Sequence, residues 1–435
     1  MTRNACLLAA ASALLLVTTM SSAVAQELPT ARPESVGMSS ERLARIDALM
    51  QRHIAAGTIA NAVTLVMRDG KVVQYKAYGS MDPAKGTPLR TDALFYMVSS
   101  SKPITAVAVL MMVEEGLIRL DDPVSRFIPE FKNQRVAVGK PGVPLPPQLP
   151  PGTAPSGPKP EADYVPASRD ITVRDLLTHT SGLNSGGLGT LVSADIQRKP
   201  TDRLADFVPQ LGKVALDFQP GTRWSYSAGS GFETLSRIVE IASGKPYDVF
   251  LKERIFGPLG MNDTGFVVPA DQQSRMLPFV RRNAQGQWAV NPPPPITSDV
   301  YFSGSTGLIS TAHDYARFEQ MLLNGGELAG KRLLAPRTVA LMRANQVGDL
   351  YRGMRGNESG MGYGLGVSVT LDETRAVWPR SNGSAGWYGA FGTLTWNDPR
   401  EGIVGVLMIQ QPSTQVQSDF GNAVLQAITQ SRPTR

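Results

Sequence analysis

Ser99 and Lys102 are the residues of this 435-residue chain whose types and spacing point most directly to chemistry. They follow the apolar run 95–98 and precede a helical pattern that begins near Ile104. A serine three residues before a lysine at the start of a helix places both side chains on one face. There the lysine amine can take the proton of the serine hydroxyl, so the pair predicts acyl transfer through a covalent intermediate on Ser99.

The same Ser-x-x-Lys spacing occurs a second time, at Ser156 and Lys159. This second pair lies in the Pro/Gly-rich run 141–160, where Pro158 prevents the helix that would bring the two side chains together. We interpret it as a chance match. For Ser99, local sequence alone also fits a serine-rich helix cap beside a solvated lysine, so the assignment depends on the surrounding sequence.

The helix predicted after Lys102 is apolar on all sides up to Val113, which is typical of a buried helix. Burial favours the neutral form of the Lys102 amine, and only that form can act as a base. Pro103 fits the first turn, where its missing N–H costs least. A backbone N–H at this helix start can also help to hold an oxyanion.

Two later stretches could complete an acyl-transfer site. Tyr226 can carry protons if it lies close to a lysine, although an ordinary core or surface tyrosine fits the local sequence as well. Residues 387–390 (Trp-Tyr-Gly-Ala) resemble a strand edge where small residues let the backbone approach a bound ester. One N–H of this edge can complete an oxyanion hole, although any glycine-rich strand start would look similar.

The first 25 residues predict a signal peptide, with Arg3, an apolar stretch at 7–20 and a small-x-small cleavage signal before Gln26. We expect cleavage after Ala25, a secreted or periplasmic bacterial protein, and no membrane anchor after cleavage. Cys6 is the single cysteine, so the mature chain has no disulfide. Removing Arg3 lowers the formal charge from +6 to +5, and the scattered basic residues argue against a nucleic-acid partner.

Strand patterns near both ends of the chain, with helical patterns between them, predict one sheet built from both termini and an inserted helical region. We expect an α/β domain from 26–100 and 303–435, and a mainly helical domain from 101–302. The Pro-rich loop 136–167 is either a tolerated insertion or a border of the active site. The expected elements are helices at 40–54, 102–115 and 416–428, hairpins at 63–67/72–78 and 392–396/403–409, and a strand at 364–370.

The order and spacing of the three motifs resemble the serine β-lactamase superfamily, most closely its class C-like branch that includes the family VIII carboxylesterases. The resemblance implies a β-lactamase/transpeptidase-like α/β fold, with an antiparallel sheet flanked by helices, and no cofactor. Further matching stretches, which extend the resemblance over 51–409, are 95–104, 121–124, 128–129, 171–183, 258–264 and 307–312.

The resemblance also implies roles for residues at matching positions. Ser99 would be the nucleophile, Lys102 its base and Tyr226 the second proton carrier. The strand carrying Trp387 and Gly389 would close the site. The backbone N–H groups of Ser99 and Ala390 would form the oxyanion hole.

Two positions depart from the β-lactamase pattern. Ala228 stands where β-lactamases have an asparagine, and Trp387 stands where they have a lysine or histidine. Both changes favour neutral esters with short to medium acyl chains, and hence a serine carboxylesterase (EC 3.1.1 type). For Trp224 and Tyr301 a core role is equally open. The candidate substrate-binding residues are Trp224, Ala228, Tyr301, Trp387, Tyr388 and Gly389.

Other functions remain open at this stage. β-Lactamase, D-amino peptidase or peptidoglycan DD-peptidase activity would use the same scaffold. A non-catalytic protein that binds cell-wall fragments is the second alternative, although it would not need Ser99, Lys102 and Tyr226 together. None of His53, His179 and His313 fits a catalytic position, and no zinc-hydrolase or α/β-hydrolase motif occurs. The oligomeric state is left open.

Overall fold

The structure is a computed structural model of the full chain. The predicted signal segment 1–25, with Cys6, lies outside the part that it describes. The described residues are 27–82, 86–292, 295–351, 353–354, 358–378 and 380–432.

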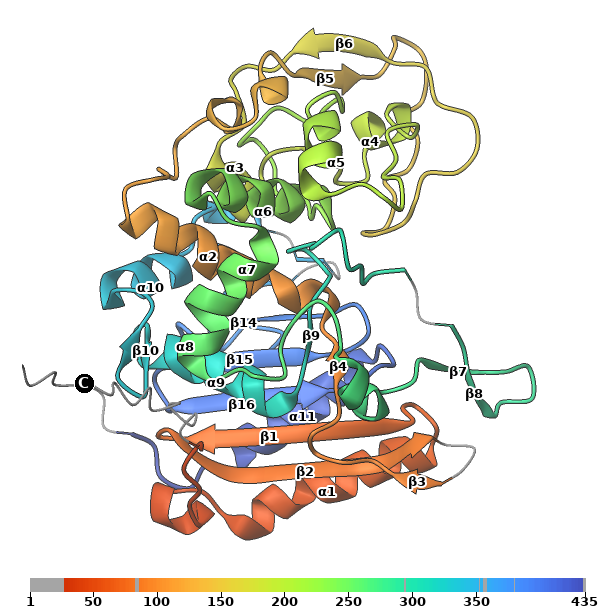
Figure 1. Cartoon of the computed structure of the whole chain (residues 1–435). Coiled ribbons are helices and arrows are strands. Elements are labelled where there is room, and N and C mark those ends of the chain that lie inside the picture. Colours follow the sequence, from red (N-terminus) through yellow and green to blue (C-terminus); the bar gives the residue numbers. More distant parts are fainter. Residues whose placement is uncertain are drawn as a thin grey trace, which may run out of the picture.

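The main sheet has eight antiparallel strands drawn from both ends of the chain (Figure 1). The first and last strands pair along Val63↔Met408 to Arg68↔Ile403, which joins the two termini in one sheet. The predicted fold class is thereby confirmed. The strands, in spatial order, are β12 (Met361–Tyr363), β13 (Ser368–Thr370), β14 (Ala385–Tyr388), β15 (Leu394–Asp398), β16 (Ile403–Met408), β1 (Asn61–Arg68), β2 (Lys71–Asp82) and β3 (Thr87–Pro88).

Helices cover both faces of this sheet, as the alternation along β1 shows. Val63, Leu65 and Met67 belong to the core cluster shared with α9 (Ala312–Leu323). Ala62 and Val66 belong to the cluster shared with α1 (Ser40–Ala55) and α11 (Thr414–Gln426). Because successive side chains point to opposite faces of a strand, β1 is buried along its whole length.

The helical region lies on one side of the sheet and centres on α2 (Lys102–Glu114) (Figure 1). Every residue of α2 from Lys102 to Met112 is buried, which confirms the prediction of a buried helix. The other helices are α3 (Val173–Leu177), α4 (Leu188–Val192), α5 (Leu204–Leu211), α6 (Ser230–Ser243), α7 (Tyr247–Leu251), α8 (Gly257–Leu259) and α10 (Pro336–Arg343).

Short strand pairs complete the fold. The paired strands are β4 (Phe95–Tyr96) with β9 (Ile309–Ser310), β5 (Arg135–Val138) with β6 (Asp163–Pro166), β7 (Val280–Arg282) with β8 (Trp288–Val290), and β10 (Glu327–Leu328) with β11 (Lys331–Arg332).

Within the described residues, no helix is long and apolar enough to span a membrane.

The structure differs from the expected elements at three places. Of the strand expected at 364–370 only 368–370 forms one, β13, because the N–H of Gly364 bonds to the carbonyl of Val367 and closes the turn that joins β12 to β13. The strand expected at 392–396 begins two residues later, because Gly392 takes part in the turn after β14. The Pro-rich segment is bounded by the β5–β6 pair, which its proline content hides at the sequence level.

Candidate active site

Ser99 lies in a single 3₁₀ turn, η2 (Val98–Ser101), immediately before α2. Its side chain is accessible only slightly, with 8% of the residue exposed. Val98 has φ of +47°, a left-handed conformation that is rare for a β-branched residue and is kept only where the surroundings enforce it. The strained turn therefore sets the position of Ser99.

Contacts from three other segments hold this turn in place. The hydroxyls of Ser100 and Thr393 lie 3.0 Å apart. The hydroxyl of Tyr315, in α9, donates to the carbonyl of Ser100 at 2.6 Å. The N–H of Leu308 donates to the hydroxyl of Ser101 at 3.2 Å. The turn between β14 and β15, helix α9 and the loop before β9 thus fix the residues that follow Ser99.

Lys102 is fully buried and lies beside Ser99, with Nζ 3.4 Å from the serine Oγ. The same Nζ donates to the carbonyls of Ala228 at 2.7 Å and Ser305 at 3.1 Å. It also lies 5.0 Å from the centre of the Tyr226 ring. Two carbonyls and the serine hydroxyl therefore surround an amine that faces the aromatic ring of Tyr226.

The loop that carries Ser305 is pressed against α2. The hydroxyl of Thr105 donates to the carbonyl of Gly304 at 2.6 Å. A Cβ on Gly304 would lie only 2.1 Å from Oγ of Ser236 and 2.6 Å from Oγ1 of Thr105, so only glycine allows this approach. The neighbouring Ser305 carbonyl is thereby brought to Lys102.

Glu233 is a half-buried residue whose carboxyl lies near this loop. The hydroxyls of Ser303 and Ser305 donate to its Oε1 at 3.1 and 3.4 Å. Burial raises the pKa of the Glu233 carboxyl, an effect that its hydrogen bonds oppose. Glu233 therefore supports the segment whose Ser305 carbonyl contacts Lys102.

Tyr226 lies in a cluster of aromatic side chains. Its ring centre is 4.5 Å from that of His179, 5.6 Å from that of Trp387 and 6.5 Å from that of Trp224. The phenol oxygen of Tyr226 is buried without a hydrogen-bond partner among the described residues. A buried hydroxyl without a partner is costly, which marks it as available for a bound molecule.

The end of β14 runs beside the turn that carries Ser99. A Cβ on Gly389 would lie 2.5 Å from the carbonyl oxygen of Met97 and 2.3 Å from Oγ1 of Thr393. Only glycine therefore lets this strand end approach the residues just before Ser99. Ala390 follows in an exposed turn, so the structure brings the segments of Ser99 and Ala390 together.

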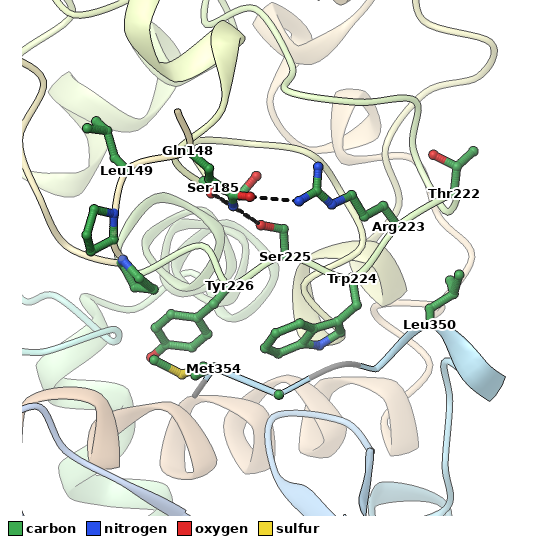
Figure 2. Close-up of a pocket in the computed structure, with 13 residues that line it drawn as sticks. Gln148, Leu149, Ser185, Thr222, Arg223, Trp224, Ser225, Tyr226, Leu350 and Met354 are labelled. Carbon is green, nitrogen blue, oxygen red and sulfur yellow. Dashed lines mark hydrogen bonds between the residues drawn. The ribbon is translucent and has the colours of Figure 1, made fainter. Parts of the chain in front are cut away.

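A cavity of about 550 Å³ opens beside Tyr226 and Trp224 (Figure 2). The Pro-rich loop forms part of its wall and is tied down by Gln148, which donates to the hydroxyl of Ser225 at 2.8 Å and accepts from Arg223 at 2.7 Å. A second cavity, of about 250 Å³, also touches Tyr226 and includes Ala228. The loop 136–167 thus borders the cavities at the candidate site.

The second Ser-x-x-Lys match forms no site. Ser156 and Lys159 are exposed outside any helix, and Lys159 pairs instead with Asp195 at 2.5 Å. This placement agrees with the interpretation of a chance match.

A model of the Beta-lactamase family matches residues 46–428. The chain belongs to this family. Esterase EstB from Burkholderia gladioli is 30% identical, over 84% of this chain and 89% of its own length. A putative D-alanyl-D-alanine carboxypeptidase from Salmonella agona (strain SL483) is 28% identical, over 93% of this chain and 91% of its own.

Solved structures agree with the family assignment. EstCE1, described as a hydrolase with promiscuous acyltransferase activity, matches with a TM-score of 0.71 at 25% identity. The match covers 88% of this chain and 98% of EstCE1. The chain is therefore a hydrolase of the β-lactamase fold.

The substrate-binding candidates of this β-lactamase-family hydrolase differ in whether they line the two cavities. Trp224 and Ala228 line the cavities, as predicted. Trp387 and Tyr388 line neither of the two cavities and are buried, stacked at 4.9 Å in the aromatic cluster. Tyr301 is a buried core residue packed against Phe207, and it lines neither of the two cavities.

The side chains of His53 and His313 lie beside carboxylates. His53 pairs with Asp419 at 2.8 Å. His313 lies 3.8 Å from Asp314. In the described ranges, no three side chains of His, Cys, Asp or Glu gather in a way that could hold a metal ion.

Sequence reasoning missed the residues that surround Lys102 with carbonyls. The Ser305 contact has no sequence signal, because every residue type carries a backbone carbonyl. Phe232, whose ring centre lies 5.6 Å from Nζ of Lys102, also escaped notice. His179 is expected from the sequence to fit no catalytic position, and its contacts with the Tyr226 segment come from the structure.

Proposed function

We propose that this β-lactamase-family hydrolase cleaves carboxylic esters with short to medium acyl chains through an acyl-enzyme on Ser99. The observation that carries the proposal is the aromatic setting of Tyr226, with Trp387 5.6 Å away and Ala228 supplying only its carbonyl to Lys102. Trp387 and Ala228 offer neither a cation for a substrate carboxylate nor a side-chain amide. A neutral ester needs neither group.

In the first step Lys102 is the base that takes the Ser99 proton. A neutral amine has two N–H bonds and one lone pair. The carbonyls of Ala228 and Ser305 accept those two N–H bonds, which leaves the lone pair for the hydroxyl at 3.4 Å. Catalytic hydrogen bonds of free enzymes are often longer than in the reacting complex.

The serine oxygen then attacks the ester carbonyl carbon, and the backbone N–H groups of Ser99 and Ala390 hold the resulting oxyanion. Tyr226 passes a proton to the leaving alkoxide as the bond between the carbonyl carbon and the alkoxy oxygen breaks, and it takes the former Ser99 proton from Lys102 in its place. Water then attacks the acyl-serine, its proton passes back through Tyr226 and Lys102, and the carboxylic acid leaves with Ser99 restored.

The preference for an ester over a lactam is the direct test of this function. Each polar group of a β-lactam left unpaired at Ala228 and Trp387 costs about 1–3 kcal/mol. We expect kcat/KM for p-nitrophenyl butyrate to exceed that for a chromogenic cephalosporin by at least about a hundredfold, at ~1.4 kcal/mol per decade. Ala228→Asn should narrow this gap. Equal values, or a preference for the cephalosporin, would favour the β-lactamase alternative.

Peptidase activity is the second candidate, and the 28% identical putative carboxypeptidase supports it. Release of D-alanine from a D-alanyl-D-alanine peptide at a rate above ester turnover would favour that function. A non-catalytic binding protein would turn over neither substrate. From the leader pattern at 1–25 we propose that the enzyme acts outside the cytoplasm.

The Pro-rich loop is proposed to form a wall of the substrate site. Gln148→Ala removes the bonds that tie this loop to Ser225 and Arg223, at about 0.5–1.5 kcal/mol each. We expect kcat/KM for p-nitrophenyl hexanoate to fall by about 3–10-fold, with a smaller loss for the acetate ester, which reaches less of the wall.

Gln210→Ala is the matched control for this loop variant, since Gln210 lies in α5 and bonds to Lys213. It should leave both esters unaffected. Equal activity of Gln148→Ala and the unaltered enzyme on every acyl length would show that the loop is a tolerated insertion.

A further inference from the structure

His179 bonds to the residue on each side of Tyr226. Its backbone carbonyl accepts the N–H of Ser225 at 3.0 Å. Its ring Nδ1 accepts the N–H of Ser227 at 3.2 Å. The two bonds hold the short segment that carries Tyr226 at both of its ends. One residue thus fixes the backbone on either side of the phenol.

The imidazole also packs against the phenol itself. The ring centres of His179 and Tyr226 are 4.5 Å apart, and those of His179 and Phe232 are 5.4 Å apart. Only 1% of His179 is exposed. The orientation of the Tyr226 ring and the position of its backbone therefore depend on the same residue, His179.

The bond to Ser227 requires a neutral imidazole. Nδ1 can accept an N–H only while it carries no proton, which assigns the ring proton to Nε2. Burial places the pKa of His179 well below its usual value. The acceptor is therefore kept through the neutral pH range.

The main chain at His179 is held from its N-terminal side. The residue follows α3 with φ of +58°, a left-handed conformation in which His and Asn are among the enriched non-glycine residues. A capping box of Thr172 and Asp175 fixes the start of α3, and Arg169 pairs with Asp175. The backbone of His179, the residue that contacts both sides of Tyr226, is thus itself fixed in place.

We propose that His179 is a positioning residue that holds the Tyr226 phenol next to Lys102 for proton transfer to the leaving group. This inference rests on the proposed catalytic role of Tyr226. Nζ of Lys102 lies 5.0 Å from the Tyr226 ring centre, so a small rotation of the segment would separate the two groups. The role is indirect, and we assign His179 no proton of its own to transfer.

Three variants distinguish the effect of the hydrogen-bond acceptor of His179 from the effect of the size of its side chain. His179→Asn keeps an acceptor close to the Nδ1 position and tolerates the left-handed backbone. His179→Gln carries its acceptor one bond further out, and His179→Leu has none. We expect His179→Leu and His179→Gln to lower kcat by about 100-fold, which is the lower end of the range for general acid–base catalysis. KM should change by less than about twofold. His179→Asn should retain activity within about fivefold of the unaltered enzyme.

The leaving group supplies a readout that a general structural defect would not reproduce. An ethyl ester has a basic leaving alkoxide that needs a proton, whereas p-nitrophenolate leaves without one. The loss in His179→Leu should therefore be larger for ethyl butyrate than for p-nitrophenyl butyrate. The same pattern is expected for Tyr226→Phe. Circular dichroism and fluorophosphonate labelling of Ser99 check that each variant is folded, and the Asn–Gln pair carries the test if the leucine variant does not fold.

A double-mutant cycle decides the proposal. In a Tyr226→Phe background, His179→Leu should lower kcat by less than about a further twofold, because the phenol that His179 positions is already absent. Fully additive losses, or a His179→Asn enzyme as slow as His179→Gln, would overturn the positioning role. A Tyr226→Phe enzyme with full activity on ethyl butyrate would instead overturn the proposed catalytic role of Tyr226, which keeps the two failures distinguishable.

Discussion

Ser99→Ala is expected to abolish ester turnover and covalent labelling by a fluorophosphonate, with a fall in kcat of at least about 10⁴-fold. The nucleophile is lost, and no other serine hydroxyl lies at Nζ of Lys102 among the described residues. The change removes one oxygen atom from a side chain that is almost buried, so the fold should persist. Steady-state kinetics with p-nitrophenyl butyrate and gel fluorescence of the labelled protein measure both effects.

Ser156→Ala is the matched control, because Ser156 shares the Ser-x-x-Lys spacing but lies exposed outside any helix. Its kinetics and labelling should equal those of the unaltered enzyme. Labelling that survives in Ser99→Ala and disappears in Ser156→Ala would reverse the assignment of the nucleophile.

Lys102→Arg is expected to lower kcat/KM by about 10³-fold, within the range for loss of a general base. Arginine keeps a positive charge but cannot release its proton near neutral pH, so it cannot accept the Ser99 proton. Both carbonyls that hold Nζ could still accept N–H bonds from a guanidinium. Charge alone would then be insufficient for turnover.

Lys159→Arg provides the control for this substitution, since Lys159 is exposed and paired with Asp195. It should behave as the unaltered enzyme. Thermal denaturation checks that Lys102→Arg remains folded, and Lys102→Gln, which also lacks a base, supplies a second measurement. Turnover near the unaltered rate in a folded Lys102→Arg would show that Lys102 contributes only charge.

The main features of the fold could be predicted because they depend on hydrophobic periodicity, which the sequence displays directly. The buried α2 and the hairpin β1–β2 are examples. The β5–β6 pair could not be predicted, because its strands flank a proline-rich stretch and pair over a separation that no local pattern reveals. The turn at Gly364 depends on tertiary packing in the same way.

In the candidate site, too, some features could be predicted from the sequence and others could not. Ser99, Lys102, Tyr226 and the strand at Trp387 could be predicted because their order and spacing resemble the serine β-lactamase superfamily, and the structure brings them together. The carbonyl of Ser305 and the two contacts of His179 with the Tyr226 segment could not. Backbone groups carry no residue-type signal, and their use becomes visible only in three dimensions.

The position of the acyl group during turnover tests the central claim most directly. The enzyme would be mixed with p-nitrophenyl butyrate, quenched in acid during turnover, digested and analysed by mass spectrometry. We predict a butyryl group on Ser99, absent from Ser99→Ala and unchanged in Ser156→Ala. Butyryl on another residue, or full turnover with no acylated serine in any quenched sample, would contradict the account.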